Sequence, residues 1–174
     1  MINDGFVLKK AETEDEKEGI KSLWRETFGD SYEYVEAFYS FFPMCENALV
    51  VLDGDKVVGM VNSLDCSAGY DDKIFHGRYI YALAVKVDYR KRGIAKRLLA
   101  AGEGGEFTML VPETPSLFEM YAHLGYSFST NVDKRFTEPQ KLLKTYKIQD
   151  GDLGTVRALI KSEVPELANA EFFI

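Results

Sequence analysis

Two neighbouring runs of residues decide the fold: YIYALAV at Tyr79–Val85, and RKRGIA at Arg90–Ala95 after a short loop. The first run is rich in aromatic and β-branched residues and predicts a strand. The second run opens a helix, because apolar residues recur behind its glycine at helical spacing. A strand that leads through such a loop into a helix brings backbone N–H groups together, and the helix dipole adds roughly half a positive charge. The two runs therefore predict an anion site.

The second run contains residue types that suit an anion. Gly93 lets the backbone approach a ligand or adopt a conformation closed to side chains, and Ala95 is small for the same kind of reason. Arg90 and Arg92 can add charge-assisted hydrogen bonds to phosphate oxygens. The spacing fits neither a Walker loop nor a Rossmann fingerprint.

Charge is distributed unevenly along the chain. The net charge of −7 over 174 residues argues against nucleic acid as a partner. The stretch from Lys86 to Arg97 nevertheless contains six basic residues and a single acid, Asp88. The basic residues of this island are Lys86, Arg90, Lys91, Arg92, Lys96 and Arg97. The island indicates either a local anion site or the solvated face of a basic helix, and charge alone does not separate the two.

Composition predicts one main domain in the cytoplasm. A hydrophobic fraction of 46% supports a core, and no stretch approaches the roughly 18 apolar residues that a membrane span needs. Polar residues interrupt the start of the chain, so no signal peptide is expected. Cys45 and Cys66 lack metal-ligand spacing and are too few for a disulfide scaffold. We predict no metal site and no membrane partner.

The remaining pattern predicts a mixed, mostly antiparallel sheet flanked by helices, since hairpins come first and a strand–helix–strand crossover follows. The order is strand, two helices, three strands, helix, strand, helix, strands. The expected elements are a strand at 6–8, a helix behind the Thr13–Glu16 capping box, a helix from Asp30 to Pro43, strands at 48–52, 56–64 and 74–85, a helix from 94, a strand at 107–111, a helix capped by Thr114, a strand within 136–148 and a helix at 152–162.

The second run resembles the Arg/Gln-x-x-Gly-x-Gly/Ala segment of the GNAT superfamily of N-acetyltransferases, with Arg90, Gly93 and Ala95 in register. In that family, backbone amides of this segment hold the pyrophosphate of acetyl-CoA. Leu83-Ala84-Val85 is similar to the family's strand ending, which hydrogen-bonds the pantetheine arm. Downstream, LFEMYAHLGY at Leu117–Tyr126 is similar to the family's FYEKLGF helix end.

The resemblance implies a GNAT fold of the α/β (α+β) class and acetyl-CoA as co-substrate. It implies an N-acyltransferase that moves the acetyl group to a primary amine by direct attack in a ternary complex. The backbone N–H of Leu83 or Ala84 is the implied oxyanion donor, and Tyr121 is the implied catalytic acid for the leaving thiolate. The spacing of Tyr121 also places it on the buried face of its helix, so a core tyrosine is the alternative. The implied cofactor-binding residues are Leu83, Ala84, Val85, Arg90, Lys91, Arg92, Gly93, Ile94 and Ala95.

Two positions depart from the family pattern. Tyr81 stands where many members carry a glutamate that can act as base, and Thr114 stands where many carry an asparagine that touches the pantetheine. The base is therefore unassigned, and Glu113, Asp65 and a water relay remain open. The missing glutamate and the unusual C-terminal tail favour an alternative function, a non-catalytic GNAT-like module that binds CoA or a protein partner.

The acceptor is expected to be a small-molecule or protein amine, and the acidic chain favours cationic amines. The predicted GNAT domain covers residues 1–148, and residues 149–174 form a C-terminal helix/strand extension that resembles the start of a second unit. Its apolar end, Phe172-Phe173-Ile174, predicts that this segment packs on the main sheet or pairs with the same segment of a second copy as a homodimer.

Overall fold

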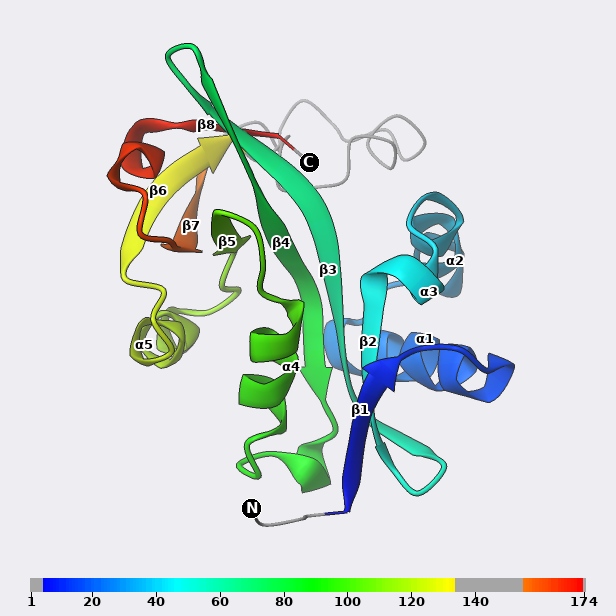
Figure 1. Cartoon of the computed structure of the whole chain (residues 1–174). Coiled ribbons are helices and arrows are strands. Elements are labelled where there is room, and N and C mark those ends of the chain that lie inside the picture. The colour runs from blue at the N-terminus through cyan, green and yellow to red at the C-terminus, as the bar shows by residue number, and fades with distance from the viewer. Residues whose placement is uncertain (1–4, 134–154, 174) are drawn as a thin grey trace. The chain divides into compact units, whose positions relative to one another are not determined.

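The computed structural model describes residues 5–133 and 155–173 and divides into two compact units (Figure 1). The first unit combines Met1–Ser63 with Tyr81–Gly102, and the second combines Leu64–Ile80 with Glu103–Ile174. Strands β3 (Lys56–Tyr70) and β4 (Lys73–Val85) contribute residues to both units. The described strands form an open, mostly antiparallel sheet, as the sequence predicts.

The first unit pairs its strands in the order β1-β2-β3-β4, and β1 and β2 are antiparallel to their neighbours. A helix pair precedes β2, and one helix follows β4. The further elements of this unit are β1 (Phe6–Lys10), α1 (Glu14–Phe28), α2 (Tyr32–Phe41), α3 (Met44–Asn47), β2 (Ala48–Asp53), the 3-10 turn η1 (Val87–Tyr89) and α4 (Ile94–Gly102).

Helices cover both faces of this part of the sheet (Figure 1). The strand β3 is bulged, because Gly59 and Val57 pair with the consecutive residues Val51 and Leu52. A bulge changes the face to which the following side chains point. A Cβ on Gly59 would lie 2.8 Å from Ile94 of α4, whereas a Cβ on Gly19 of α1 would lie 2.5 Å from Val57. Glycine therefore permits close helix–strand packing in each case.

The start of α1 confirms the predicted capping box. The Thr13 hydroxyl accepts the N–H of Glu16 at 3.2 Å, and the Glu16 carboxylate accepts the N–H groups of Thr13 at 3.1 Å and Glu12 at 2.8 Å. Lys9 Nζ adds a third hydrogen bond to the same carboxylate at 3.0 Å. The two backbone N–H donors, followed by Lys9, lower the pKa of Glu16 from 4.5 to about 2.

This cap predicts a pH-dependent stability. The unfolded carboxylate titrates near 4.5 and the folded one near 2, so its contribution is present above pH 4.5 and is lost as the pH falls toward 2. We expect Glu16→Gln to lower the unfolding free energy by about 1 kcal/mol at neutral pH. Urea unfolding should show this difference shrinking between pH 4.5 and 2.

The control is Glu14→Gln, which removes an exposed carboxylate of the same helical turn that pairs with Lys17 at 2.6 Å. Exposed pairs of this kind contribute roughly 0–1 kcal/mol, so this variant should remain close to the wild type. A difference for Glu16→Gln that does not change with pH would contradict the assignment.

The second unit contains the sheet's parallel pair, in which Gly77–Ile80 of β4 lie beside Phe107–Leu110 of β5. Beyond β5, the strands β7 and β6 continue the order as antiparallel neighbours, and β8 pairs with β3. The further elements are β5 (Phe107–Leu110), α5 (Pro115–His123), β6 (Phe128–Asp133), β7 (Thr155–Lys161), the 3-10 helix η3 (Pro165–Asn169) and β8 (Glu171–Phe173).

The helix predicted at 152–162 is wrong, because the structure forms strand β7 there. The helical prediction depended on Leu153, Val156, Leu159 and Ile160 at helical spacing, but periodicity does not separate a short buried strand from a helix. β7 lies between β5 and β6, which supply backbone partners on both edges. Three consecutive residues, Ala158 to Ile160, are buried, as is typical of an interior strand.

Several other predictions have clear outcomes. The second helix begins at Tyr32 with Ser31 as its cap, and the Ser31 hydroxyl accepts the N–H of Tyr34 at 3.1 Å; the predicted start at Asp30 is early. The helix behind Thr114 and Pro115 is present as α5. The sequence did not predict β6, and the strand expected within 136–148 lies outside the described residues. In the C-terminal segment β7 and β8 pair within the chain, while the domain boundary after residue 148 and the homodimer stay predictions.

Candidate functional site

The last residues of β4 depart from regular strand geometry. Ala82 has a φ of 56°, in the left-handed region that non-glycine residues seldom adopt. A left-handed residue interrupts the ladder and re-aims the backbone groups beside it. Beyond the interruption, the N–H of Lys86 donates to the carbonyl of Val58 at 2.9 Å, so the end of β4 stays attached to β3. The predicted residues Leu83, Ala84 and Val85 directly follow this irregularity.

The strained residue gives a stability prediction. A left-handed alanine costs roughly 1–2 kcal/mol, and the extra flexibility of glycine in the unfolded chain costs about 0.4–1 kcal/mol. We therefore expect Ala82→Gly to raise the free energy of unfolding by about 0.5–1 kcal/mol, measured by denaturant titration. The matched control is Ala84→Gly, on the same strand without a positive φ. That variant should lose about 0.5–1 kcal/mol, and equal losses for both variants would refute the strain.

The loop behind β4 is fixed by its own backbone. The N–H groups of Tyr89 and Arg90 donate to the carbonyls of Lys86 and Val87 at 2.9 and 3.2 Å. The Arg90 side chain turns back toward the strand, where its Nε donates to the carbonyl of Val85 at 3.2 Å. Lys91 is left-handed, with a φ of 61°. The loop therefore delivers the chain to the start of α4 in a defined conformation.

Gly93 caps α4 and leaves its first N–H groups uncovered. Its carbonyl accepts the N–H of Arg97 at 3.1 Å, and its φ is 77°. The first N–H groups of any helix, here those of Ile94, Ala95 and Lys96, have no acceptor within the helix. A glycine cap has no side chain to satisfy them, and the first turn of α4 carries no acid. A Cβ on Gly93 would meet no atom within 4 Å, so the space on that side of the cap residue is open.

The helix itself is anchored from behind. Ile94 and Leu98 are buried, and both approach Gly59 of β3. At the other end of α4, the hydroxyl of Ser63 donates to the carbonyl of Gly102 at 2.6 Å. Because the side chain of Ile94 is in the core, only its backbone can take part in the predicted site.

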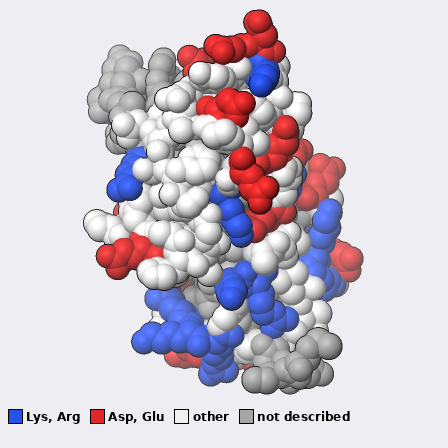
Figure 2. All heavy atoms as spheres, turned by 60° about the vertical axis from the view of Figure 1, so that its left-hand side comes forward, with Lys and Arg blue, Asp and Glu red and all other residues white. Residues whose placement is uncertain are grey.

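The basic island is partly engaged and partly exposed. Arg92 lies 5.0 Å from the ring centre of Tyr89, and Lys56 lies 5.1 Å from the same ring. The Tyr89 hydroxyl donates to Asp53 at 2.8 Å, which holds this ring in place. Lys91 and Lys96 are exposed. Figure 2 shows basic side chains gathered on the lower part of one face, beside mixed and acidic regions above.

Tyr121 lies in the second unit, on α5, and is buried with 8% of its surface exposed. Its ring meets that of Tyr126 edge-on, with centres 5.9 Å apart. Burial raises the pKa of Tyr121 to about 12. The hydroxyl therefore stays protonated at neutral pH, and Tyr121 can donate a proton or a hydrogen bond but cannot serve as a base.

The other candidates from the sequence are exposed residues of the second unit. Asp65 forms an ion pair with Arg78, so its carboxylate is already engaged. Glu113 is exposed in the loop before α5. Thr114 caps α5 without a side-chain bond to the helix, and its hydroxyl lies 3.1 Å from that of Ser116.

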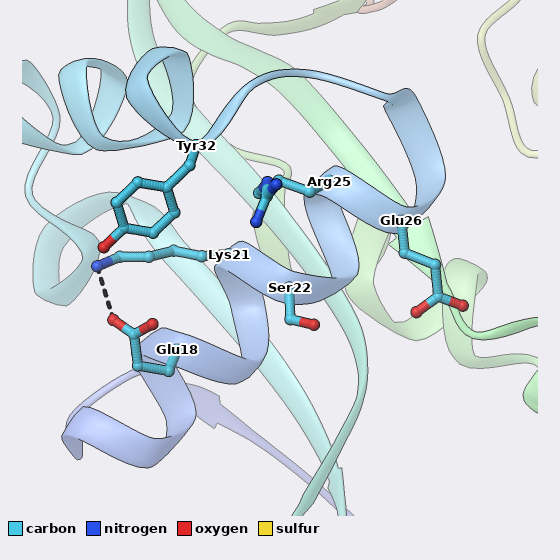
Figure 3. A pocket seen from close by; sticks show the side chains of 6 residues that line it. All are labelled: Glu18, Lys21, Ser22, Arg25, Glu26 and Tyr32. Carbon is cyan, nitrogen blue, oxygen red and sulfur yellow. Dashed lines mark hydrogen bonds and ion pairs between the residues drawn. The ribbon is translucent and has the colours of Figure 1, made fainter.

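The sequence did not predict a hollow of about 360 Å³ on α1 and the start of α2 (Figure 3). Lys21 lines this hollow and forms ion pairs with Glu18 at 2.9 Å and with Glu36 at 2.5 Å. The lining residues are Glu18, Lys21, Ser22, Arg25, Glu26 and Tyr32, and none of them is a predicted site residue.

Comparison with known families identifies the scaffold. The model of the acetyltransferase (GNAT) domain matches residues 9–129, which is more than half of the chain. The chain belongs to the GNAT acetyltransferase family. Its glycine-capped helix behind an irregular β4 is thus a feature of a GNAT domain. No curated protein matches the chain.

Solved structures confirm the GNAT fold. A GCN5-related N-acetyltransferase from Kribbella flavida is 21% identical, with a TM-score of 0.58 over 72% of this chain and 34% of the other. A chain in the structure of the NatC complex with Gag peptide and CoA is 19% identical, with a TM-score of 0.58 over 91% of this chain and 99% of the other. N-acetylglutamate synthase from Neisseria gonorrhoeae, complexed with coenzyme A and N-acetyl-glutamate, is 18% identical. Its TM-score is 0.53 over 90% of this chain and 34% of the other. The chain spans about a third of the Kribbella flavida structure and 46% of a putative acetyltransferase from Pyrococcus horikoshii.

The described residues contain neither a metal-ligand cluster nor a membrane-spanning helix. Within 5–133 and 155–173, the GNAT chain has no cluster of three His, Cys, Asp or Glu side chains suited to a metal ion. In the same part of the chain, no helix has the length and apolar character needed to cross a membrane.

Proposed function

We propose that this GNAT domain transfers an acetyl group from acetyl-CoA to a primary amine by direct attack in a ternary complex. The observation that carries the proposal is the start of α4, where the cap is a glycine with open space at its Cβ position and the first turn carries no acid. Membership of the GNAT family supports acetyl transfer as the reaction, and the geometry at the start of α4 suits an anionic cofactor.

The start of α4 is the proposed pyrophosphate site. The N–H groups of Ile94, Ala95 and Lys96, which follow the Gly93 cap, and the positive end of the helix dipole favour negative charge. Arg90, Lys91 and Arg92 directly precede Gly93 in the sequence and add cationic side chains. The pantetheine arm would then run along Leu83, Ala84 and Val85, where Ala82 has interrupted the ladder.

The reaction needs a free amine and a donor for the oxyanion. An amine with a pKa of about 10.4 is neutral only about once in 2,500 at pH 7, so a proton must leave before attack. The backbone N–H of Leu83 or Ala84 is the proposed oxyanion donor, because both residues directly follow the left-handed Ala82, where the backbone departs from regular strand geometry. Tyr121 is the proposed acid for the departing thiolate.

The pKa of Tyr121 limits how it can act. A pKa of about 12 lies above the value of an ordinary thiol, about 8.5, so complete proton transfer to sulfur is uphill. We infer that Tyr121 acts first by donating a hydrogen bond to the sulfur as negative charge develops on it. A hydrogen bond to a charged partner is worth about 1.5–3 kcal/mol even without complete transfer.

The acceptor is proposed to be a small-molecule or protein amine. The net charge of −7 favours amines that arrive as cations and disfavours nucleic acid. The position of Tyr81 in place of the glutamate common in the family favours a second candidate, a domain that binds CoA without turnover.

One experiment separates the two candidates. Calorimetry with acetyl-CoA tests binding, and release of free thiol with a panel of amino acids, polyamines, aminoglycosides and lysine peptides tests transfer. Binding with amine-dependent thiol release is the expected result. Binding without release in every member of the panel supports the non-catalytic candidate, and absence of binding overturns the proposed function.

A further inference from the structure

The first unit contains a pair of tyrosine hydroxyls directly before the irregular part of β4. The Tyr81 hydroxyl on β4 lies 2.9 Å from the Tyr34 hydroxyl on α2. Both side chains are half-buried. Tyr81 precedes Leu83 by two residues, with the left-handed Ala82 between them. The hydroxyl pair is therefore carried by the same short segment as the proposed oxyanion donors.

Aromatic packing fixes the ring of Tyr81. It stacks on Phe38 of α2, with ring centres 5.3 Å apart and an angle of 10°. It also meets Trp24 of α1 edge-on at 5.8 Å. Trp24 and Phe38 are buried, so neither ring can move without disturbing the core. The packing of its ring therefore gives the Tyr81 hydroxyl a defined position.

Two of the described carboxylates on the elements around this pair have other partners. Asp30, behind α1, accepts the indole N–H of Trp24 at 2.7 Å. Glu36 on α2 pairs with Lys21 at 2.5 Å, and Glu33 precedes Tyr34 at the exposed start of that helix. The remaining titratable neighbour is Tyr39, whose pKa is raised by burial.

On β3, Asn62 is fully buried and accepts the hydroxyl of Tyr39 at 2.9 Å, while its Nδ2 has no hydrogen-bond partner in the described part of the chain. An unsatisfied buried donor costs about 1–3 kcal/mol. The core on this side of the sheet therefore contains polar groups, the Tyr39 hydroxyl and the Asn62 amide, as well as aromatic rings.

We propose that Tyr81 and Tyr34 relay the proton that the acceptor amine must lose. This inference rests on the proposed function and assigns the base that the sequence leaves open. The ammonium N–H bond breaks as an O–H bond forms at Tyr81, whose own proton passes to Tyr34. The proton of Tyr34 passes to water. The amine becomes neutral, one proton reaches solvent, and both tyrosines end uncharged.

The test uses Tyr81→Phe and Tyr34→Phe, which keep the rings, together with Tyr39→Phe as the matched control. Tyr39 belongs to the same cluster, packing edge-on against Trp24 at 5.5 Å and Phe38 at 5.1 Å, but its hydroxyl bonds to Asn62. The readouts are acetyl-CoA affinity by calorimetry and the pH profile of kcat/KM for the best amine of the panel.

We expect each relay variant to lose about 10²-fold in kcat/KM at pH 7, within the usual range for acid–base catalysis. The loss should shrink as the pH approaches the pKa of the amine, since a neutral amine needs no relay. It should also shrink for a fluorinated analogue of that amine with a low pKa. Acetyl-CoA affinity should not change, and Tyr39→Phe should keep the wild-type profile.

Three results would overturn the relay. They are a loss under about threefold, a loss that is the same at every pH, or an equal shift in Tyr39→Phe. A wild-type protein that binds no acetyl-CoA, or releases no thiol with any amine, instead refutes the proposed function and with it the relay.

Discussion

Gly93→Val is expected to weaken acetyl-CoA binding by about 10²-fold or more in a protein that still folds. The space around Gly93 is open on the protein side, so the valine side chain would occupy the region where the pyrophosphate is proposed to lie. Two lost charge-assisted hydrogen bonds at about 1.5 kcal/mol each correspond to this factor. Calorimetry on both proteins measures it.

The control for this variant is Gly29→Val at the end of α1. Gly29 has a φ of 74°, against 77° for Gly93, and a Cβ on either would meet no atom within 4 Å. Both substitutions therefore impose the same backbone strain, roughly 1–2 kcal/mol. Only the Gly93 variant should lose affinity. Unchanged affinity in Gly93→Val would show that the ligand binds elsewhere.

Tyr121→Phe is expected to lower kcat by about 10- to 10²-fold while acetyl-CoA affinity stays nearly intact. The substitution removes one oxygen and keeps the ring, so the edge contact with Tyr126 should survive. The loss arises because the leaving sulfur no longer receives a hydrogen bond. Rapid measurement of thiol release with the best amine of the panel gives kcat directly.

Tyr126→Phe is the matched control in the same unit. Tyr126 is also buried, and its hydroxyl donates to Glu103 at 3.1 Å. Removing it should cost about 0.5–1.5 kcal/mol of stability and leave kcat close to the wild type. If Tyr121→Phe also lost less than about threefold in kcat, Tyr121 would be a core tyrosine and the acid would have to be another group.

Local sequence signals predicted the elements that local chemistry stabilises. The Thr13–Glu16 box begins α1, the Asp53-Gly54-Asp55 turn joins β2 to β3, and Pro115 stands in the first turn of α5. Each signal works over three or four residues and requires no distant partner. The same locality explains why the segment Arg90–Ala95 could be recognised as a glycine-capped helix start.

The C-terminal region shows where such signals fail. β7 has an apolar pattern that suits a helix as well as a strand, and the positions of β5 and β6 decided between them. Those partners are distant in the sequence or arrive from the other side of the undescribed residues 134–154. The pattern of one segment contains no record of which edges of a sheet remain to be paired.

The sequence by itself determined the family, the order of the strands and longer helices up to α5 and the glycine that caps α4, because each depends on short-range spacing. Only the tertiary structure decided that Ala82 is left-handed and that the Tyr81 hydroxyl lies beside that of Tyr34. Alanine has no preference for a left-handed conformation, and Tyr34 and Tyr81 are 47 residues apart. Both features exist because packing against β3, α1 and α2 stabilises them, and that packing forms only when the first unit folds.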